Sequence, residues 1–108
     1  MSLSTHVLDA TAGRPAAGME VSLWCRTDDG GYEMLHSGTT DTDGRIAGWR
    51  LRSGRHRLVF STGDWWRRRD TPTFHPEAVV TFTVADPDAH HHVPLLLSPF
   101  AYSTYKGS

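Results

Sequence analysis

The sequence has 108 residues, of which 38% are hydrophobic and 21% charged, with a formal net charge of −1 at pH 7. This length suits one domain, expected over residues 1–108, and the composition excludes a disordered or membrane-spanning chain. The slightly acidic balance gives no overall attraction to nucleic acid or to an acidic lipid surface.

Alternation of apolar and polar residues with a period of two dominates the chain and predicts short strands. The strands expected in the first half are 4–9 (STHVLD), 19–26 (MEVSLWCR) and 32–40 (YEMLHSGTT). A DDGG turn at 28–31 makes a hairpin of the last two. A second turn, DTDG at 41–44, comes directly before Arg45.

In the second half, four more strands and one short helix are expected. The strands are 55–62 (RHRLVFST), 78–85 (AVVTFTVA), 90–97 and 101–105. Pro94 would confine its strand to an edge or to a position without a ladder hydrogen bond. The helix is expected around 64–69, with Asp64 as its N-cap. Many short strands separated by Gly, Asp and Pro turns indicate an all-β sandwich.

Cysteine content and the chain start point to the cytoplasm. Cys25 is the only cysteine, so no disulfide can form within one chain. Residues 1–13 lack the basic start and the apolar run of a secretory signal. The longest apolar stretch, Val93 to Leu97 interrupted by Pro94, is too short to cross a bilayer.

Three consecutive histidines, His90 to His92, are the first candidates for chemistry. On a strand, His90 and His92 project to one face and His91 to the other. Imidazole pairs suit zinc, copper or nickel, but a catalytic metal site needs about three protein ligands and a structural site about four. The sequence shows no complete set, so no metal is expected. A neutral histidine is also the natural general base near neutral pH.

Arg45 and His6 are the next candidates. Arg45 follows a turn and should stand at a sheet end, where its planar fork could hold a carboxylate, an enolate or paired carbonyl oxygens. His6 lies in the first expected strand. Taken alone, Arg45 reads as an ordinary solvated arginine and His6 as a hydrogen-bonded core or edge histidine.

Arginines near tryptophans, at 49–57 and in WWRRR at 65–69, allow a nucleic-acid interpretation. The acidic overall charge and the lack of a nucleic-acid-binding signature favour a solvated strand face instead. Trp65 and Trp66 could also cover a partner surface, since Trp and Arg are enriched at protein interfaces.

Four blocks of sequence carry a family resemblance. They are LSTHVLDATAGRPAAGMEVSLW (3–24), DTDGRI (41–46), FHPEA (74–78) and HHHVPLLLSPFAYSTYKGS (90–108). In this order they resemble the 5-hydroxyisourate hydrolases, the transthyretin-related proteins of purine catabolism. The last block is similar to that family's usual ending, H-Y-H-V-P-L-L-L-S-P-F-G-Y-S-T-Y-R-G-S, and the four blocks span nearly the whole chain.

The resemblance implies a transthyretin-like fold: an immunoglobulin-like two-sheet β-sandwich of seven to eight strands with at most one short helix. It implies a homotetramer, a dimer of dimers, with active sites where the dimers meet. The family's reaction is ring-opening hydrolysis of 5-hydroxyisourate at a cyclic amide bond, which yields 2-oxo-4-hydroxy-4-carboxy-5-ureidoimidazoline in urate degradation. It implies no metal or organic cofactor, no nucleic acid and no membrane.

Matching positions imply the site residues. His6, Arg45, His92 and Ser108 would be catalytic, and His6, Arg45 and Tyr105 would bind substrate. A histidine would take the proton of the attacking water, and Arg45 would stabilise the charged oxygen or anchor the polar edge of the ring. Ser108 would orient water or a histidine. Which histidine is the base stays open.

The chain departs from the family's usual ending at His91, Ala101 and Lys106, where tyrosine, glycine and arginine are usual. The main alternative function is a non-catalytic small-molecule carrier of the same fold, as transthyretin is for thyroid hormone. Such carriers lack the closing Y-(R/K)-G-S and the matching histidines and arginine, all of which this chain has. A metal- or nucleic-acid-binding module is a third alternative.

Overall fold

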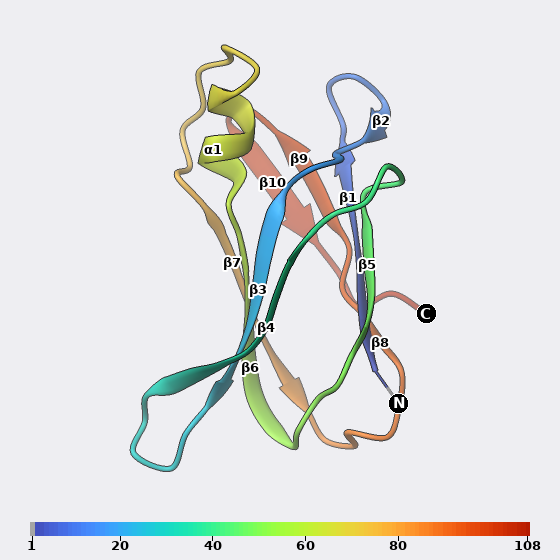
Figure 1. Ribbon diagram of the computed structural model, residues 1–108, viewed down its shortest axis with the longest axis vertical. Coiled ribbons are helices and arrows are strands. Elements are labelled where there is room, and N and C mark those ends of the chain that lie inside the picture. Colours follow the sequence, from blue (N-terminus) through green and yellow to red (C-terminus); the bar gives the residue numbers. More distant parts are fainter. Residues whose placement is uncertain (1) are drawn as a thin grey trace.

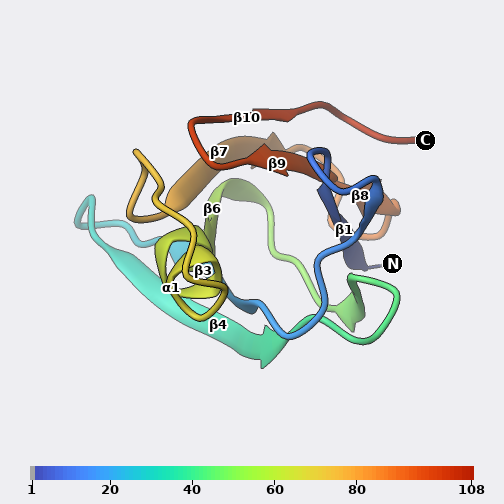
Figure 2. The same ribbon diagram turned by 90° about the horizontal axis from the view of Figure 1, so that it is seen from above.

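The computed structural model describes residues 2–108, which form two β-sheets packed face to face, with one short helix at one end (Figures 1 and 2). The first sheet contains β1 (Leu3–Asp9), β2 (Arg14–Pro15), β5 (Arg45–Trp49), β8 (His91–His92), β9 (Leu95–Ser98) and β10 (Ala101–Thr104). The second contains β4 (Tyr32–Thr39), β3 (Glu20–Arg26), β6 (Gly54–Phe60) and β7 (Ala78–Val84), in that order. Helix α1 (Thr62–Arg67) joins β6 to β7.

The transthyretin-like sandwich expected from the sequence is confirmed. Among the described residues, eight strands have four or more residues, and β2 and β8 have two each. The predicted strand 90–97 is two strands, β8 and β9, because Pro94 has no N–H to continue the ladder. Both pair with β1 in parallel. At the interruption, the Thr5 hydroxyl donates to the Val93 carbonyl at 2.6 Å.

The core lies between the sheets and follows from the period-two alternation. In β1, Leu3, Thr5, Val7 and Asp9 are buried, while Ser4, His6 and Leu8 are only partly buried on the outward face. The largest side chains that close the core from both sheets are Phe60, Leu3, Met19, Leu23, Leu58, Leu95 and Leu97. The inward face of β1 therefore anchors the strand in the core and leaves its outward face to carry function.

Helix α1 begins at Thr62, with Ser61 as its N-cap residue, so the prediction of Asp64 as N-cap is wrong. Asp64 lies inside the first turn, where its carboxylate accepts a hydrogen bond from Arg67 at 2.7 Å. The start is set by a tertiary contact, because Gly63 donates to the Pro76 carbonyl at 3.0 Å. A Cβ at Gly63 would lie 2.5 Å from that oxygen, so only glycine fits.

Trp65 and Trp66 do not form a partner surface, because they are only 3% and 4% exposed. The Trp65 indole donates to the Ala17 carbonyl at 2.8 Å, and the two rings meet edge to face. The helix thus uses both tryptophans to close one end of the sandwich. Within residues 2–108, no helix has the length and apolar character needed to cross a membrane.

His56 makes the stability of the fold depend on pH. Its side chain is fully buried and stacks on Phe82. Nδ1 donates to the Gly54 carbonyl at 3.0 Å and Nε2 accepts from the Arg52 N–H at 3.4 Å, which is the pattern of a neutral ring. Burial lowers the pKa of His56 below its usual value.

We expect the free energy of unfolding to fall as the pH drops below about 6.5, the pKa of His56 in the unfolded chain. Below this pH the unfolded chain binds a proton at His56 and the folded protein does not. The stabilisation that comes from neutral His56 is therefore present above this pH and is lost below it. His56 alone adds a slope of at most about 1.4 kcal/mol per pH unit. Urea unfolding of His56→Gln between pH 5 and 8 should give a shallower slope. Equal slopes for the variant and the wild type would contradict the role of His56.

Candidate active site

Three of the predicted site residues meet on the outward face of the first sheet. Antiparallel pairing of β1 with β5 sets His6 opposite Arg45. Parallel pairing of β1 with β8 sets Ser4 opposite His92. Residues directly opposite each other in a sheet project to the same face, and so do residues two apart on one strand. We call His6, Arg45 and His92 the basic cluster.

The turn before β5 fixes the position of Arg45. The Asp41 carboxylate accepts from the backbone N–H of Asp43 and of Arg45, each at 2.9 Å. Gly44 has a φ of +75°, and its Cβ would lie 2.4 Å from the Val7 carbonyl, so this position requires glycine. The Arg45 side chain is exposed and forms no ion pair with any described residue. Its guanidinium is therefore free to bind a ligand.

His92 is set up to accept a proton. Its Nδ1 lies 2.8 Å from the Ser4 hydroxyl, and its Nε2 has no hydrogen-bond partner within residues 2–108. Burial is the largest cause that lowers the pKa of His92, followed by the nearby charges of Arg45, His90 and His6. A lowered pKa keeps the imidazole neutral near neutral pH, which is the form that a general base needs.

The tail after β10 passes over His92. An isolated bridge pairs Gly107 with His92, and the Gly107 N–H donates to the His92 carbonyl at 2.8 Å. Tyr105 and His92 both line a cavity of about 260 Å³ between the tail and β7. Tyr105 is 60% exposed and Ser108 is exposed. The fold thus places Tyr105 and His92 around one cavity, but no hydrogen bond among the described residues joins Tyr105 or Ser108 to the basic cluster.

Gly107 contacts the His92 ring, although the sequence points to it only as part of the closing Y-K-G-S and gives it no role of its own. A Cβ at this position would lie 2.5 Å from Cδ2 and 3.1 Å from Cγ of the His92 ring. Neither Gly107 nor the equally informative Ser4 belongs to a residue type that signals chemistry by itself. The only sequence signals are that Ser4 lies two residues from His6, and so on the same face of the strand, and that the tail closes with K-G-S.

Replacing Gly107 by alanine is expected to push the His92 ring out of place. With His92 as the predicted general base, turnover should fall about tenfold or more, because small displacements of a catalytic group are costly. The native fold should persist, since Gly107 is outside the core. Steady-state kinetics together with near-ultraviolet circular dichroism measure both effects. Gly31→Ala is the control, because Gly31 is exposed and its Cβ would lie no nearer than 3.2 Å to another atom, the Asp29 side-chain oxygen. Equal activity of Gly107→Ala and wild type would show that the tail does not constrain His92.

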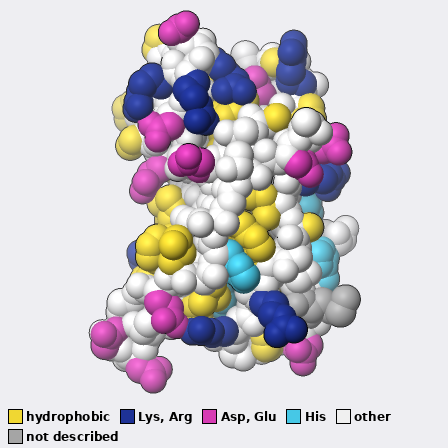
Figure 3. Space-filling model, in the orientation of Figure 1, with side chains coloured by type: hydrophobic (Ala, Val, Ile, Leu, Met, Phe, Trp, Pro, Cys, Tyr) yellow, Lys and Arg dark blue, Asp and Glu magenta, His cyan; other side chains and the backbone are white. Residues whose placement is uncertain are grey.

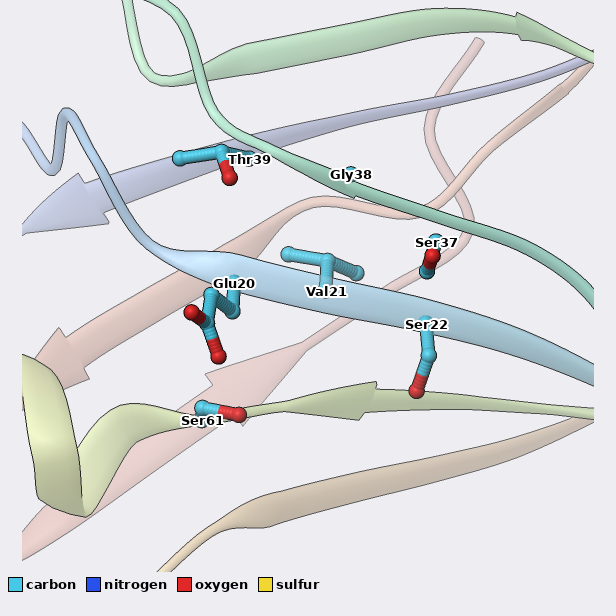
Figure 4. A pocket seen from close by; sticks show the side chains of 7 residues that line it. All are labelled: Glu20, Val21, Ser22, Ser37, Gly38, Thr39 and Ser61. Carbon is cyan, nitrogen blue, oxygen red and sulfur yellow. The ribbon is translucent and has the colours of Figure 1, made fainter.

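Other features of the surface do not compete with this site. A hollow of about 300 Å³ on the second sheet, with Glu20 as its one titratable lining residue, contains none of the predicted site residues (Figure 4). On the face shown in Figure 3, acidic and basic side chains are interspersed, so this face offers no continuous basic track for nucleic acid. Within residues 2–108, no three His, Cys, Asp or Glu side chains are grouped to hold a metal ion.

Comparison with known proteins identifies relatives along the whole chain. Residues 3–107 match the model of the HIUase/Transthyretin family. The 5-hydroxyisourate hydrolase of Salmonella typhi is 44% identical over 110 residues, which cover 98% of this chain and 80% of the relative. The 5-hydroxyisourate hydrolase of Pseudomonas aeruginosa is 40% identical over 115 residues, which cover 98% and 90%.

Solved structures show the same fold. The Klebsiella pneumoniae 5-hydroxyisourate hydrolase has a TM-score of 0.87 and 38% identity, with 100% of both chains covered. Sea bream transthyretin in complex with thyroxine has a TM-score of 0.91 and 33% identity, with 97% of this chain and 93% of that chain covered. Similarity of the backbone therefore does not distinguish a hydrolase from a transthyretin. Both similarities nevertheless point to the same family. The chain belongs to the HIUase/Transthyretin family.

Proposed function

We propose that this protein is a 5-hydroxyisourate hydrolase, which opens a cyclic amide of 5-hydroxyisourate to give 2-oxo-4-hydroxy-4-carboxy-5-ureidoimidazoline. The observation that carries the proposal is the basic cluster, in which an imidazole held neutral lies on the same sheet face as an unpaired guanidinium. Relatives of this name at 44% and 40% identity support it. One catalytic domain over residues 1–108, working in the cytoplasm without a metal or organic cofactor, completes the proposal.

The cluster suits hydrolysis of an amide. Nε2 of His92 takes a proton from water as the water oxygen bonds to the ring carbonyl carbon, and negative charge develops on the carbonyl oxygen. Arg45 is placed to stabilise that charge with its guanidinium or to hold the polar edge of the ring. Cleavage of the carbon–nitrogen bond then needs a proton on the leaving nitrogen, which His92 returns or His6 donates. Tyr105 and Ser108 complete the set as substrate-binding and water-orienting residues.

We include a homotetramer, a dimer of dimers, in the proposal. The face that carries the basic cluster is open in a single chain, and a second copy over it would exclude water from the substrate. Strands β7 and β10 end their sheets, and exposed strand edges invite pairing with another chain. Val79, Phe100 and Tyr105 are large exposed apolar side chains near these edges, at 38%, 66% and 60% exposure. In such a tetramer, the exposed strand edges would pair chains into dimers, and the open face with the basic cluster would form the active sites between the dimers.

The experiment that tests the function follows freshly made 5-hydroxyisourate. Urate oxidase generates the compound, and its ultraviolet absorbance decays as the ring opens spontaneously. We expect this protein to accelerate the decay in proportion to its concentration, and the His92→Ala variant to restore nearly the background rate. A folded wild-type protein that leaves the background rate unchanged would overturn the proposed function.

A further inference from the structure

One hydroxyl group lies between two imidazole rings beside the basic cluster. The Oγ of Ser4 is 2.8 Å from Nδ1 of His92 and 3.1 Å from Nε2 of His90. Ser4 lies in β1, His92 in β8, and His90 directly before β8. His91, between the two, turns away and places its Nδ1 3.0 Å from the Ala89 carbonyl. We call His90, Ser4 and His92 the hydroxyl bridge.

The chemistry of a hydroxyl restricts this bridge to two proton arrangements. Serine has one hydrogen to donate and lone pairs with which to accept, so it donates to one ring and accepts from the other. If His92 donates through Nδ1 and Ser4 donates to His90, then Nε2 of His92 is unprotonated and can act as a base. If the direction is reversed, Nε2 of His92 carries the proton and can act as an acid.

We propose that Ser4 and His90 are positioning residues that set, through the shared hydroxyl, which nitrogen of His92 carries the proton. The proposal rests on the proposed hydrolase function. In the resting protein, Nδ1 of His92 donates to Ser4 and Ser4 donates to His90, which directs the free lone pair of Nε2 at the substrate.

The same bridge moves a proton during the reaction. When Nε2 of His92 takes a proton from water, the Nδ1 proton passes to Ser4 Oγ while the Ser4 hydroxyl proton passes to Nε2 of His90. One N–H and one O–H bond break, one O–H and one N–H bond form, and the positive charge moves from His92 to His90. When Nε2 of His92 gives its proton to the leaving nitrogen, the relay runs back: the proton on Nε2 of His90 passes to Ser4 Oγ and the Ser4 hydroxyl proton passes to Nδ1 of His92, which restores the resting arrangement.

The surroundings favour this direction of transfer. Burial lowers the pKa of His92, and the charges of Arg45 from β5, His90 and His6 from β1 lower it further, which outweighs the raising effect of a hydrogen bond to the Ser4 backbone, so a positive charge there is costly. His90 is exposed, and a charge on it is solvated. The bridge therefore carries the charge from a partly buried position to a solvated one.

The test compares Ser4→Ala, which removes the hydroxyl, with Ser4→Thr, which keeps it on a residue suited to a strand. We expect Ser4→Ala to lower kcat about tenfold or more with little change in KM. Part of the His92 population would then carry its proton on Nε2 and could not act as the base, which loses part of the rate acceleration of about 10²–10⁴ that general acid–base catalysis provides. Ser4→Thr should restore most of kcat. Ser37→Ala, which removes an exposed hydroxyl from β4 in the second sheet, is the control and should keep wild-type kinetics.

A second measurement does not depend on turnover. Long-range proton–nitrogen correlation spectra of the imidazole rings should show that neutral His92 carries its proton mainly on Nδ1 in wild type and on a mixture of both nitrogens in Ser4→Ala. Removing the neighbouring charge in His90→Ala should raise the pKa of His92 and shift the acid limb of kcat to higher pH. An unchanged tautomer in Ser4→Ala, or a kcat that threonine does not restore, overturns the bridge. A wild-type protein with the expected tautomer but no hydrolysis supports the bridge and overturns the proposed function.

Discussion

His92→Ala is expected to lower kcat for 5-hydroxyisourate by about 10²- to 10⁴-fold, the range by which a positioned base accelerates proton transfer. His92 is the histidine of the cluster whose Nδ1 is already held, at 2.8 Å from Ser4, and whose lowered pKa keeps the ring neutral. Stopped-flow absorbance at saturating substrate measures kcat directly. KM should change little, because the lost interaction belongs to the transition state rather than to substrate binding.

The control for His92→Ala is His91→Ala, which removes the adjacent imidazole that bonds Ala89 instead of Ser4. Both variants should keep the wild-type near-ultraviolet spectrum and the wild-type oligomeric state. A folded His92→Ala protein that keeps more than about a tenth of wild-type kcat would remove His92 from the role of base and leave His6 as the candidate.

Arg45→Ala is expected to lower kcat/KM by about 10²- to 10³-fold, the typical effect of removing one group that stabilises a developing oxyanion. The side chain has no ion-pair partner among the described residues, so its loss leaves no orphaned charge in the protein. Arg45→Lys should recover only part of the loss, because lysine keeps the charge without the planar fork. Initial rates over a range of substrate concentrations give kcat/KM for each variant.

The matched control is Arg55→Ala, which removes an exposed arginine from β6 in the second sheet. It should behave as wild type in kcat/KM and in thermal stability. If Arg55→Ala and Arg45→Ala lose activity equally, the effect comes from overall charge rather than from the basic cluster.

The strands could be predicted from the sequence where alternation alone decides them. In β3 and β7 every second residue is apolar and the structure buries most of that face, although Trp24 and Val79 lie on the opposite face. Local pattern failed where a distant contact decides: α1 begins at Thr62 because Gly63 packs under Pro76, and no rule for caps contains that contact. The sequence allowed Trp65 and Trp66 to be interface residues. It could not show that they are buried, because burial depends on which other parts of the fold lie over them.

The basic cluster could be predicted only through the family resemblance, because the spacing of residues along the sequence does not show that β1 lies between β5 and β8. Once the family blocks were matched, His6, Arg45 and His92 were expected together, and the register brings them to one face. Their roles stay predictions. The contacts of Ser4 and Gly107 could not be predicted from the sequence, because serine on a strand face and glycine near a chain end are ordinary. Their contacts with the His92 ring exist only after β1, β8 and the tail come together.

The most direct measurement counts the substrate molecules converted per chain. A hydrolase and a carrier share the same backbone fold, but only a hydrolase converts substrate repeatedly. Wild-type protein is mixed with a large molar excess of freshly generated 5-hydroxyisourate, and the product is quantified above the spontaneous background. Thyroxine binding is measured by calorimetry on the same sample. We expect many substrate molecules to be converted per chain, with the ring-opened carboxylate as product. Conversion at the background rate alone, with stoichiometric uptake of a small molecule, would contradict the hydrolase and identify a carrier.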